Sequence, residues 1–155
     1  MNIFATSRSL KRAALTSFRV LFLTCMVTAL PALAAKTAKQ AQVVYHIDDS
    51  QRAISMLRSI VNHHRAAPKV KLVVVALSGG IDFLVDGAKD ERGNSYDALV
   101  DPLITAGVEF RVCNNTLEAR KIDPATLLPG VKPVPSGVAE IARMQLEEGA
   151  AYIKP

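Results

Sequence analysis

Residues 70–77 read Val-Lys-Leu-Val-Val-Val-Ala-Leu, and this run is bounded by Pro68 on one side and by Gly79-Gly80 on the other. A short apolar run between turn-forming residues is typical of a strand that is buried on both faces. Such strands occur in parallel sheets whose two faces are covered by helices. The run therefore predicts that this chain of 155 residues folds as an α/β domain built around residues 70–77.

The stretches on either side of this run alternate between strand-like and helix-like patterns. In the helix-like stretches, apolar residues recur at three- and four-residue spacing, as in helices that bury one face. Within one of them Pro102 is expected to kink the helix or to divide it into two turns. The alternation predicts a three-layer α/β domain with a mostly parallel sheet of about five strands. The expected strands are 43–47, 70–77, 108–112, 131–134 and 150–153, and the expected helices are 51–66, 95–106, 114–121 and 136–148.

The first 34 residues have the features of an export signal. A basic stretch precedes an apolar run at 20–30, and Ala32-Leu33-Ala34 fits the small-x-small cleavage pattern. We therefore expect a signal peptide at 1–34, a flexible leader at 35–41 and the α/β domain at 42–155. The mature protein would be periplasmic or secreted, with no membrane attachment. An uncleaved membrane anchor is the alternative.

The positive charge of the chain belongs to this signal. The formal net charge is +5, from 19 Lys and Arg against 14 Asp and Glu. Four of the basic residues lie in the signal, so 19 less 4 leaves 15 against 14 acidic residues, a net charge of +1. The remaining chain has no basic stripe with interleaved aromatic residues, so we do not expect nucleic-acid binding. The four are Arg8, Lys11, Arg12 and Arg19.

With the signal removed, Cys113 is the only cysteine of the mature chain, because the other one, Cys25, lies in the apolar run. Cys113 stands between the expected strand 108–112 and the expected helix 114–121, and ligand sites of parallel sheets gather at such strand ends. Amide groups at the start of a helix favour a thiolate, so Cys113 is a candidate reactive thiol. The alternative is a buried cysteine that acts as a small hydrophobic side chain.

No metal or cofactor site is expected. A zinc site needs several ligands close together, and the three histidines come from parts of the sequence distant from Cys113. We interpret His63 and His64 as surface residues in the last turn of a helix. The pair Gly79-Gly80 lacks the spacing of a phosphate-binding loop, which favours an ordinary turn.

Three stretches of the chain resemble the DsrE/DsrF-like family of small sulfur-relay proteins, in particular its exported members. These are the first strand and acidic helix start at 43–49, the strand-Cys-helix segment at 110–120, and the closing stretch from Val134-Pro135-Ser136-Gly137 to the end. The resemblance implies a flavodoxin-like α/β/α fold and a homo-oligomer, a trimer or a hexamer. It also implies a cysteine that accepts sulfane sulfur as a persulfide, at the position of Cys113, with a sulfur donor or acceptor protein as partner.

If Cys113 is active, nearby residues would support it. Arg111 and Arg120 are close in sequence and would lower its pKa. Thr116 and Arg120 stand three and seven residues after it, on the same helical face, and Arg120 would stabilise the persulfide anion. The simpler interpretation of Arg120 is an exposed helix residue that pairs with Glu118 or Asp123.

Two residues at the end of the first strand are weaker candidates. His46 or Asp48 could transfer a proton if that strand end lies beside Cys113. The simpler interpretations are a polar residue at a strand end for His46 and a helix N-cap for Asp48.

Three functions remain open from the sequence. The first is a sulfur carrier that holds a persulfide on Cys113 in sulfur transfer or oxidation. The second is a non-catalytic, oligomeric binding or assembly module in which the cysteine is buried and inert. The third is a redox sensor that uses the thiol reversibly.

Overall fold

The computed structural model describes residues 39–155. The expected signal peptide at 1–34 and residues 35–38 of the expected leader lie outside the described residues. The last residues before the first strand hydrogen-bond to the domain: Lys39 Nζ to the carbonyl of Glu147 at 2.5 Å and Gln40 Nε2 to the carbonyl of Lys69 at 3.0 Å. Within residues 39–155, no helix has both the length and the apolar character that a membrane span requires.

The strands form one five-stranded sheet in the order β4-β3-β2-β1-β5, and every neighbouring pair is parallel. The long strand predicted from its apolar run is β2, at the centre of the sheet. The parallel sheet predicted from the sequence is thereby confirmed. The strands are β1 (Gln42–Asp49), β2 (Lys71–Gly79), β3 (Glu109–Cys113), β4 (Lys132–Val134) and β5 (Ala151–Ile153).

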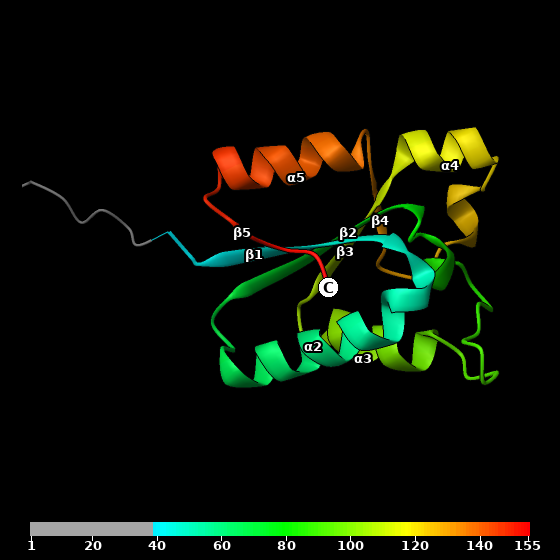
Figure 1. Ribbon diagram of the computed structural model, residues 1–155, viewed down its shortest axis with the longest axis horizontal. Coiled ribbons are helices and arrows are strands. Elements are labelled where there is room, and N and C mark those ends of the chain that lie inside the picture. The colour runs from blue at the N-terminus through cyan, green and yellow to red at the C-terminus, as the bar shows by residue number, and fades with distance from the viewer. Residues whose placement is uncertain (1–38) are drawn as a thin grey trace, which may run out of the picture. The chain divides into compact units, whose positions relative to one another are not determined.

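Helices cover both faces of the sheet (Figure 1), which gives the three layers of a flavodoxin-like fold. The helices α2 (Ala53–Ala66) and α3 (Asp97–Thr105) lie on one face. The helices α4 (Asn114–Arg120) and α5 (Gly137–Leu146) lie on the other. Short 3-10 turns occur at Ser50–Arg52, Asp82–Leu84 and Pro124–Thr126.

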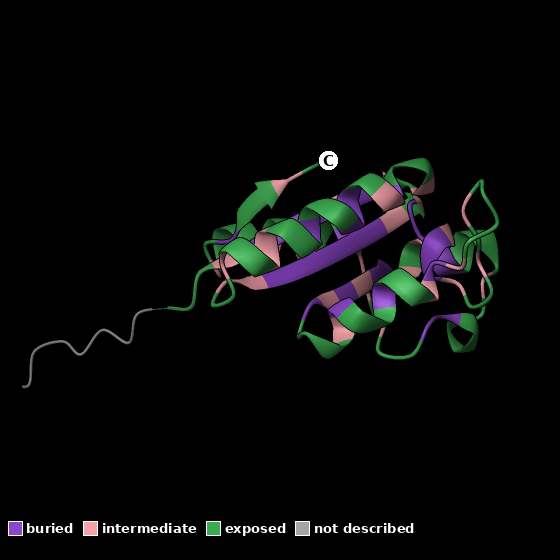
Figure 2. Ribbon diagram, turned by 90° about the horizontal axis from the view of Figure 1, so that it is seen from below, coloured by how far each residue is buried: buried purple, intermediate pink, exposed green. Residues whose placement is uncertain are grey.

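The alternation of side chains along β2 divides the core into two parts. Leu72 and Val74 pack in the larger part, with α2 and α3, whereas Val73 and Val75 pack in the smaller part, against α5. Figure 2 shows that the middle of the sheet is buried between the helices, whereas the outer faces of the helices are exposed. The strand β2 lacks alternating polar residues because helices cover it on both faces.

Pro102 lies inside α3 without dividing it, which excludes one of the two arrangements considered from the sequence. Two local details differ from the sequence prediction. The helix α3 begins at Asp97 rather than Ser95, because Ser95 forms an antiparallel bridge with Lys89. At the end of β1 the capping side chain is Asp49, whose Oδ1 accepts the N–H of Gln51 at 3.0 Å, so Asp48 is not the N-cap.

Candidate functional site

Cys113 is the last residue of β3 and the N-cap residue of α4, with an extended backbone conformation (φ −71°, ψ 114°). Its side chain is buried, with 6% of the residue exposed. Leu77 of β2 and Gly137 of α5 pack beside it, since a β-carbon at position 137 would lie 3.0 Å from Cβ of Cys113 and 3.2 Å from Cδ2 of Leu77. The absence of a side chain at residue 137 therefore lets the first turn of α5 approach Cys113 this closely.

The surroundings of Cys113 favour the thiolate. Burial raises the pKa of the Cys113 thiol, but hydrogen bonding by the N–H of Gly137, by the hydroxyl and N–H of Thr116 and by the N–H of Asn115 outweighs it, so the net pKa is lowered. These groups come from two elements, α4 and α5, that are distant in the sequence. Neutral dipoles from two sides are therefore the main cause of the lowered pKa.

Thr116 also connects Cys113 to the turn after β2. Its Oγ1 accepts the N–H of Ser78 at 3.2 Å. Ser78 has a φ of 53°, in the left-handed region that residues other than glycine rarely adopt. The prediction from the sequence that Thr116 lies next to Cys113 is consistent with the hydrogen bonding of its hydroxyl and N–H to the thiol.

Arg120 binds the same turn. Its Nη1 donates to the carbonyl of Ser78 at 3.0 Å, and its Nη2 forms an ion pair with Asp82 at 2.7 Å. Glu118 and Asp123, the partners considered from the sequence, are not its ion-pair partners, because the helix directs Arg120 toward the turn after β2. Glu118 instead accepts from Asn114, and Asp123 caps the turn at Ala125.

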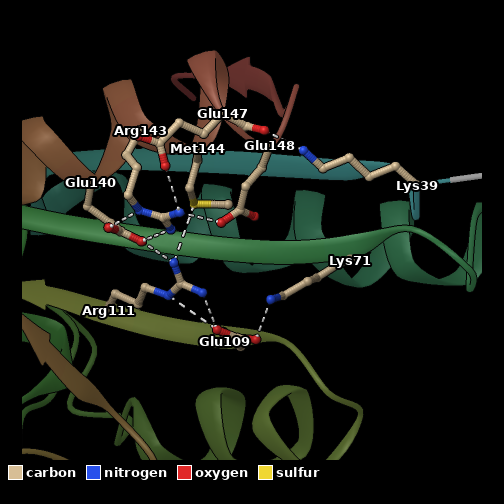
Figure 3. Close-up of polar contacts among 9 residues, drawn as sticks. All are labelled: Lys39, Lys71, Glu109, Arg111, Glu140, Arg143, Met144, Glu147 and Glu148. Atoms are coloured by element: carbon tan, nitrogen blue, oxygen red, sulfur yellow. Dashed lines mark hydrogen bonds and ion pairs between the residues drawn. The ribbon is translucent and has the colours of Figure 1, made fainter.

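Arg111 does not act on the thiol as a free cation. It pairs with Glu109 of its own strand at 2.5 Å and with Glu140 of α5 (Figure 3). Glu140 pairs in turn with Arg143 at 2.8 Å, and Lys71 pairs with Glu109 at 2.8 Å. Because two carboxylates flank its guanidinium, the sequence-based expectation that the Arg111 charge itself lowers the pKa of Cys113 does not describe this arrangement.

His46 and Asp48 belong to another part of the sheet. The Nδ1 of His46 is 2.8 Å from the hydroxyl of Tyr152, and Asp48 pairs with Lys154 at 2.6 Å. Burial lowers the pKa of His46, and the hydrogen bond from Lys154 lowers the pKa of Asp48. These contacts join β1 to the end of the chain, whereas β2 separates β1 from β3. The strand end that carries His46 and Asp48 is therefore not the one adjacent to Cys113.

The histidines do not form a metal site in the described part of the chain. No group of three or more His, Cys, Asp or Glu side chains suited to a metal occurs in residues 39–155. His63, interpreted from the sequence as a surface residue, has its Nδ1 2.8 Å from the hydroxyl of the buried Tyr45. It is thus part of the packing between α2 and β1.

The position of Gly137 and Leu77 beside Cys113 was not predicted from the sequence. The signal that could have found them is strand order. Cys113 pairs with Val134 of β4, so the residues that follow β4 come next to the residues that follow β3. Ser136 then starts α5 by accepting the N–H of Ala139 at 3.4 Å, which directs the N–H of Gly137 to this edge of the sheet.

Comparisons with known proteins give one family model and two similar solved structures. The model of the DsrE/DsrF-like family matches residues 32–155. The protein of unknown function MTH1491 from Methanobacterium thermoautotrophicum is 38% identical, with a TM-score of 0.65, over 74% of this chain and 99% of that one. The ychN protein from E. coli has a similar fold at 18% identity, with a TM-score of 0.62, over 75% of this chain and 99% of that one. No curated protein matches the chain.

Proposed function

Because this chain belongs to the DsrE/DsrF-like family, which suggests a role related to sulfur relay, we propose that it carries sulfane sulfur as a persulfide on Cys113. The observation that carries the proposal is the position of Cys113 at the start of α4 and against Gly137 of α5. N–H groups of these two helices lower the pKa of its thiol although the residue is buried. Structural cysteines in apolar surroundings have the opposite shift.

The chemistry is two exchange steps without net oxidation. The Cys113 thiolate attacks the outer sulfur of a donor persulfide, an S–S bond to the donor breaks, and the donor leaves as a thiolate with the electron pair. Cys113 then holds the sulfur as Cys-S-S⁻. An acceptor thiolate attacks that outer sulfur and releases Cys113 as a thiolate again.

The hydrogen-bond donors around Cys113 serve both steps. They stabilise the attacking thiolate in the first step and the leaving thiolate in the second, because a thiol of lower pKa leaves faster. Thr116 contributes a hydroxyl and an N–H to the same sulfur, and Gly137 contributes an N–H. Arg120 holds the turn after β2 against Thr116 through Ser78 and does not itself pair with the thiol.

Intact-mass measurement after incubation with polysulfide tests this function. A gain of about 32 Da on Cys113, removed by a reducing thiol, is expected of a sulfur carrier. Cys113→Ser is the matched control, and it should gain no mass under the same conditions. A wild-type protein that stays unmodified while remaining folded would show that Cys113 is not a sulfur carrier.

One observation favours a second function. Cys113 is only 6% exposed, as expected of an inert thiol in a non-catalytic assembly module. Alkylation of the native protein separates the two functions. No reaction of Cys113 with a small alkylating agent would end the carrier function, and the redox-sensor function with it.

We also propose that the protein is exported and acts as a homo-oligomer with a sulfur donor or acceptor protein. The support is the export-signal pattern of residues 1–34 and the family to which the chain belongs. Expression of the full chain followed by fractionation and N-terminal sequencing tests export, with Ala35 as the expected first residue. A mature protein that still begins at Met1 would contradict cleavage.

A further inference from the structure

The helix α5 contacts β3 at two successive positions. Gly137 packs against Cys113, and three residues later Glu140 pairs with Arg111. Residues two apart on a strand point to the same face, and residues three apart on a helix share a face. Both contacts therefore lie in the same interface between α5 and the sheet.

The Arg111–Glu140 ion pair is well shielded in this interface. The exposed fractions of the two side chains are 12% and 13%. In Figure 3, the guanidinium of Arg111 lies between Glu109 on the strand and Glu140 on the helix, and it also donates to the sulfur of Met144 at 3.6 Å. A charge pair with little access to water constrains geometry strongly, because separating it leaves two poorly solvated charges.

We propose that Arg111 and Glu140 are positioning residues for the thiol: their ion pair holds the first turn of α5 on β3 and thereby keeps the N–H of Gly137 on the sulfur of Cys113. This inference rests on the proposed function of Cys113. Arg111 acts through the helix and not through its own charge, since Glu109 and Glu140 neutralise that charge. A hydrogen bond weakens steeply with distance, so a small outward movement of α5 is enough to lose it.

The other charged groups of this interface have different roles. Lys71 of β2 pairs with Oε1 of Glu109, whereas Arg111 pairs with Oε2 of the same carboxylate, so Glu109 lies between the two cations (Figure 3). Arg143 pairs with Glu140 and, at 2.6 Å, with Glu148, so its ion pairs stay within α5 and the residues that follow it. Arg143 therefore shares a partner with Arg111 without connecting α5 to the strand. This makes Arg143 the matched control for the proposal.

The test is the pH dependence of Cys113 alkylation by iodoacetamide, whose midpoint reports ionisation of the thiol. Arg111→Met and Glu140→Gln are each expected to move the midpoint to higher pH. At about pH 6.5 the rate, relative to its plateau, should fall about fivefold, because the thiolate fraction falls. Arg111→Lys should restore part of the shift, since a lysine can pair with Glu140 but lacks the planar fork that binds two carboxylates.

Arg143→Met is expected to keep the wild-type midpoint. The proposal is overturned if Arg111→Met and Glu140→Gln both keep the wild-type midpoint, or if Arg143→Met shifts it equally. Thermal unfolding confirms that each variant is folded. Because Arg111 is on β3 and Glu140 is on α5, the test can still be made with one variant if the other does not fold. The assay contains no sulfur donor. A wild-type protein that takes up no sulfur while the midpoints shift as expected would therefore contradict the carrier function and support the positioning role.

Discussion

Gly137 packs directly against Cys113: a β-carbon at position 137 would lie 3.0 Å from Cβ of Cys113, a tighter approach than most β-carbons make. Gly137 has no positive φ, so its backbone alone does not require glycine. The close approach of α5 to the end of β3 is what favours glycine, since a β-carbon would force Cys113 and Leu77 to shift.

Gly137→Ala is therefore expected to move the first turn of α5 away from Cys113. The alkylation midpoint of Cys113 should rise, and the free energy of unfolding should fall by about 1 kcal/mol, a usual cost of overpacking. Alkylation across pH and urea unfolding measure the two effects. Val138→Ala is the control, since Val138 is on the same turn and 66% exposed, and it should change neither quantity.

Thr116→Val should raise the pKa of Cys113, because it removes the hydroxyl that hydrogen-bonds to the thiolate and keeps the shape of the side chain. In the wild type the alkylation rate should reach half of its plateau below about pH 8.5, the value of an ordinary cysteine. In Thr116→Val the midpoint should move up, toward that value. Thr116→Ser, which keeps the hydroxyl, should stay close to the wild type. An equal shift in both variants would assign the effect to packing.

Gly80→Ala should destabilise the fold much more than Gly79→Ala. A β-carbon at position 80 would lie 2.3 Å from the carbonyl oxygen of Ile47, whereas at position 79 the nearest atom is the carbonyl oxygen of Asp48 at 3.4 Å, an ordinary contact. At position 80 the β-carbon would clash with backbone atoms, so β1 or the turn after β2 would have to move. We expect a loss of about 3 kcal/mol or more for Gly80→Ala in urea unfolding. Similar losses for the two variants would contradict the close approach.

Glu140 should make the fold sensitive to acid. Its hydrogen bond with Arg143 and the charge of Arg111 lower its pKa in the folded state, against the effect of burial. Because the folded pKa is below the unfolded one, about 4.3 for glutamate, its ionisation stabilises the fold above that pH. This stabilisation is lost as the pH falls through the folded pKa.

Glu140→Gln measures this contribution. The variant should be less stable than the wild type at about pH 7, and the difference should narrow as the pH is lowered below the unfolded pKa of about 4.3. Urea unfolding at a series of pH values gives the comparison. A difference that stays constant with pH would mean that the loss comes from packing and not from ionisation.

Much of the architecture was predictable from local patterns. The uninterrupted apolar run of β2 required cover on both faces, and the alternation of strands and helices required parallel crossovers. The position of Cys113 between β3 and α4 was also predictable, because a β-type run ends there and a helical one begins. These are properties of neighbouring residues, which the order of amino acids states directly.

The partners of the thiol were decided by the tertiary structure. Gly137 follows Cys113 by 24 positions, counted from 113 to 137, and it reaches the sulfur because β4 pairs with β3. Arg111 was expected to act by its charge, but the packing of α5 supplied Glu140 and turned it into a connection between strand and helix. His46 and Asp48 were separated from Cys113 because β2 lies between β1 and β3. Periodicity specifies which residues form each element, whereas strand order specifies which elements meet. The electrostatics of Cys113 depend on strand order, because the groups around its thiol come from different elements.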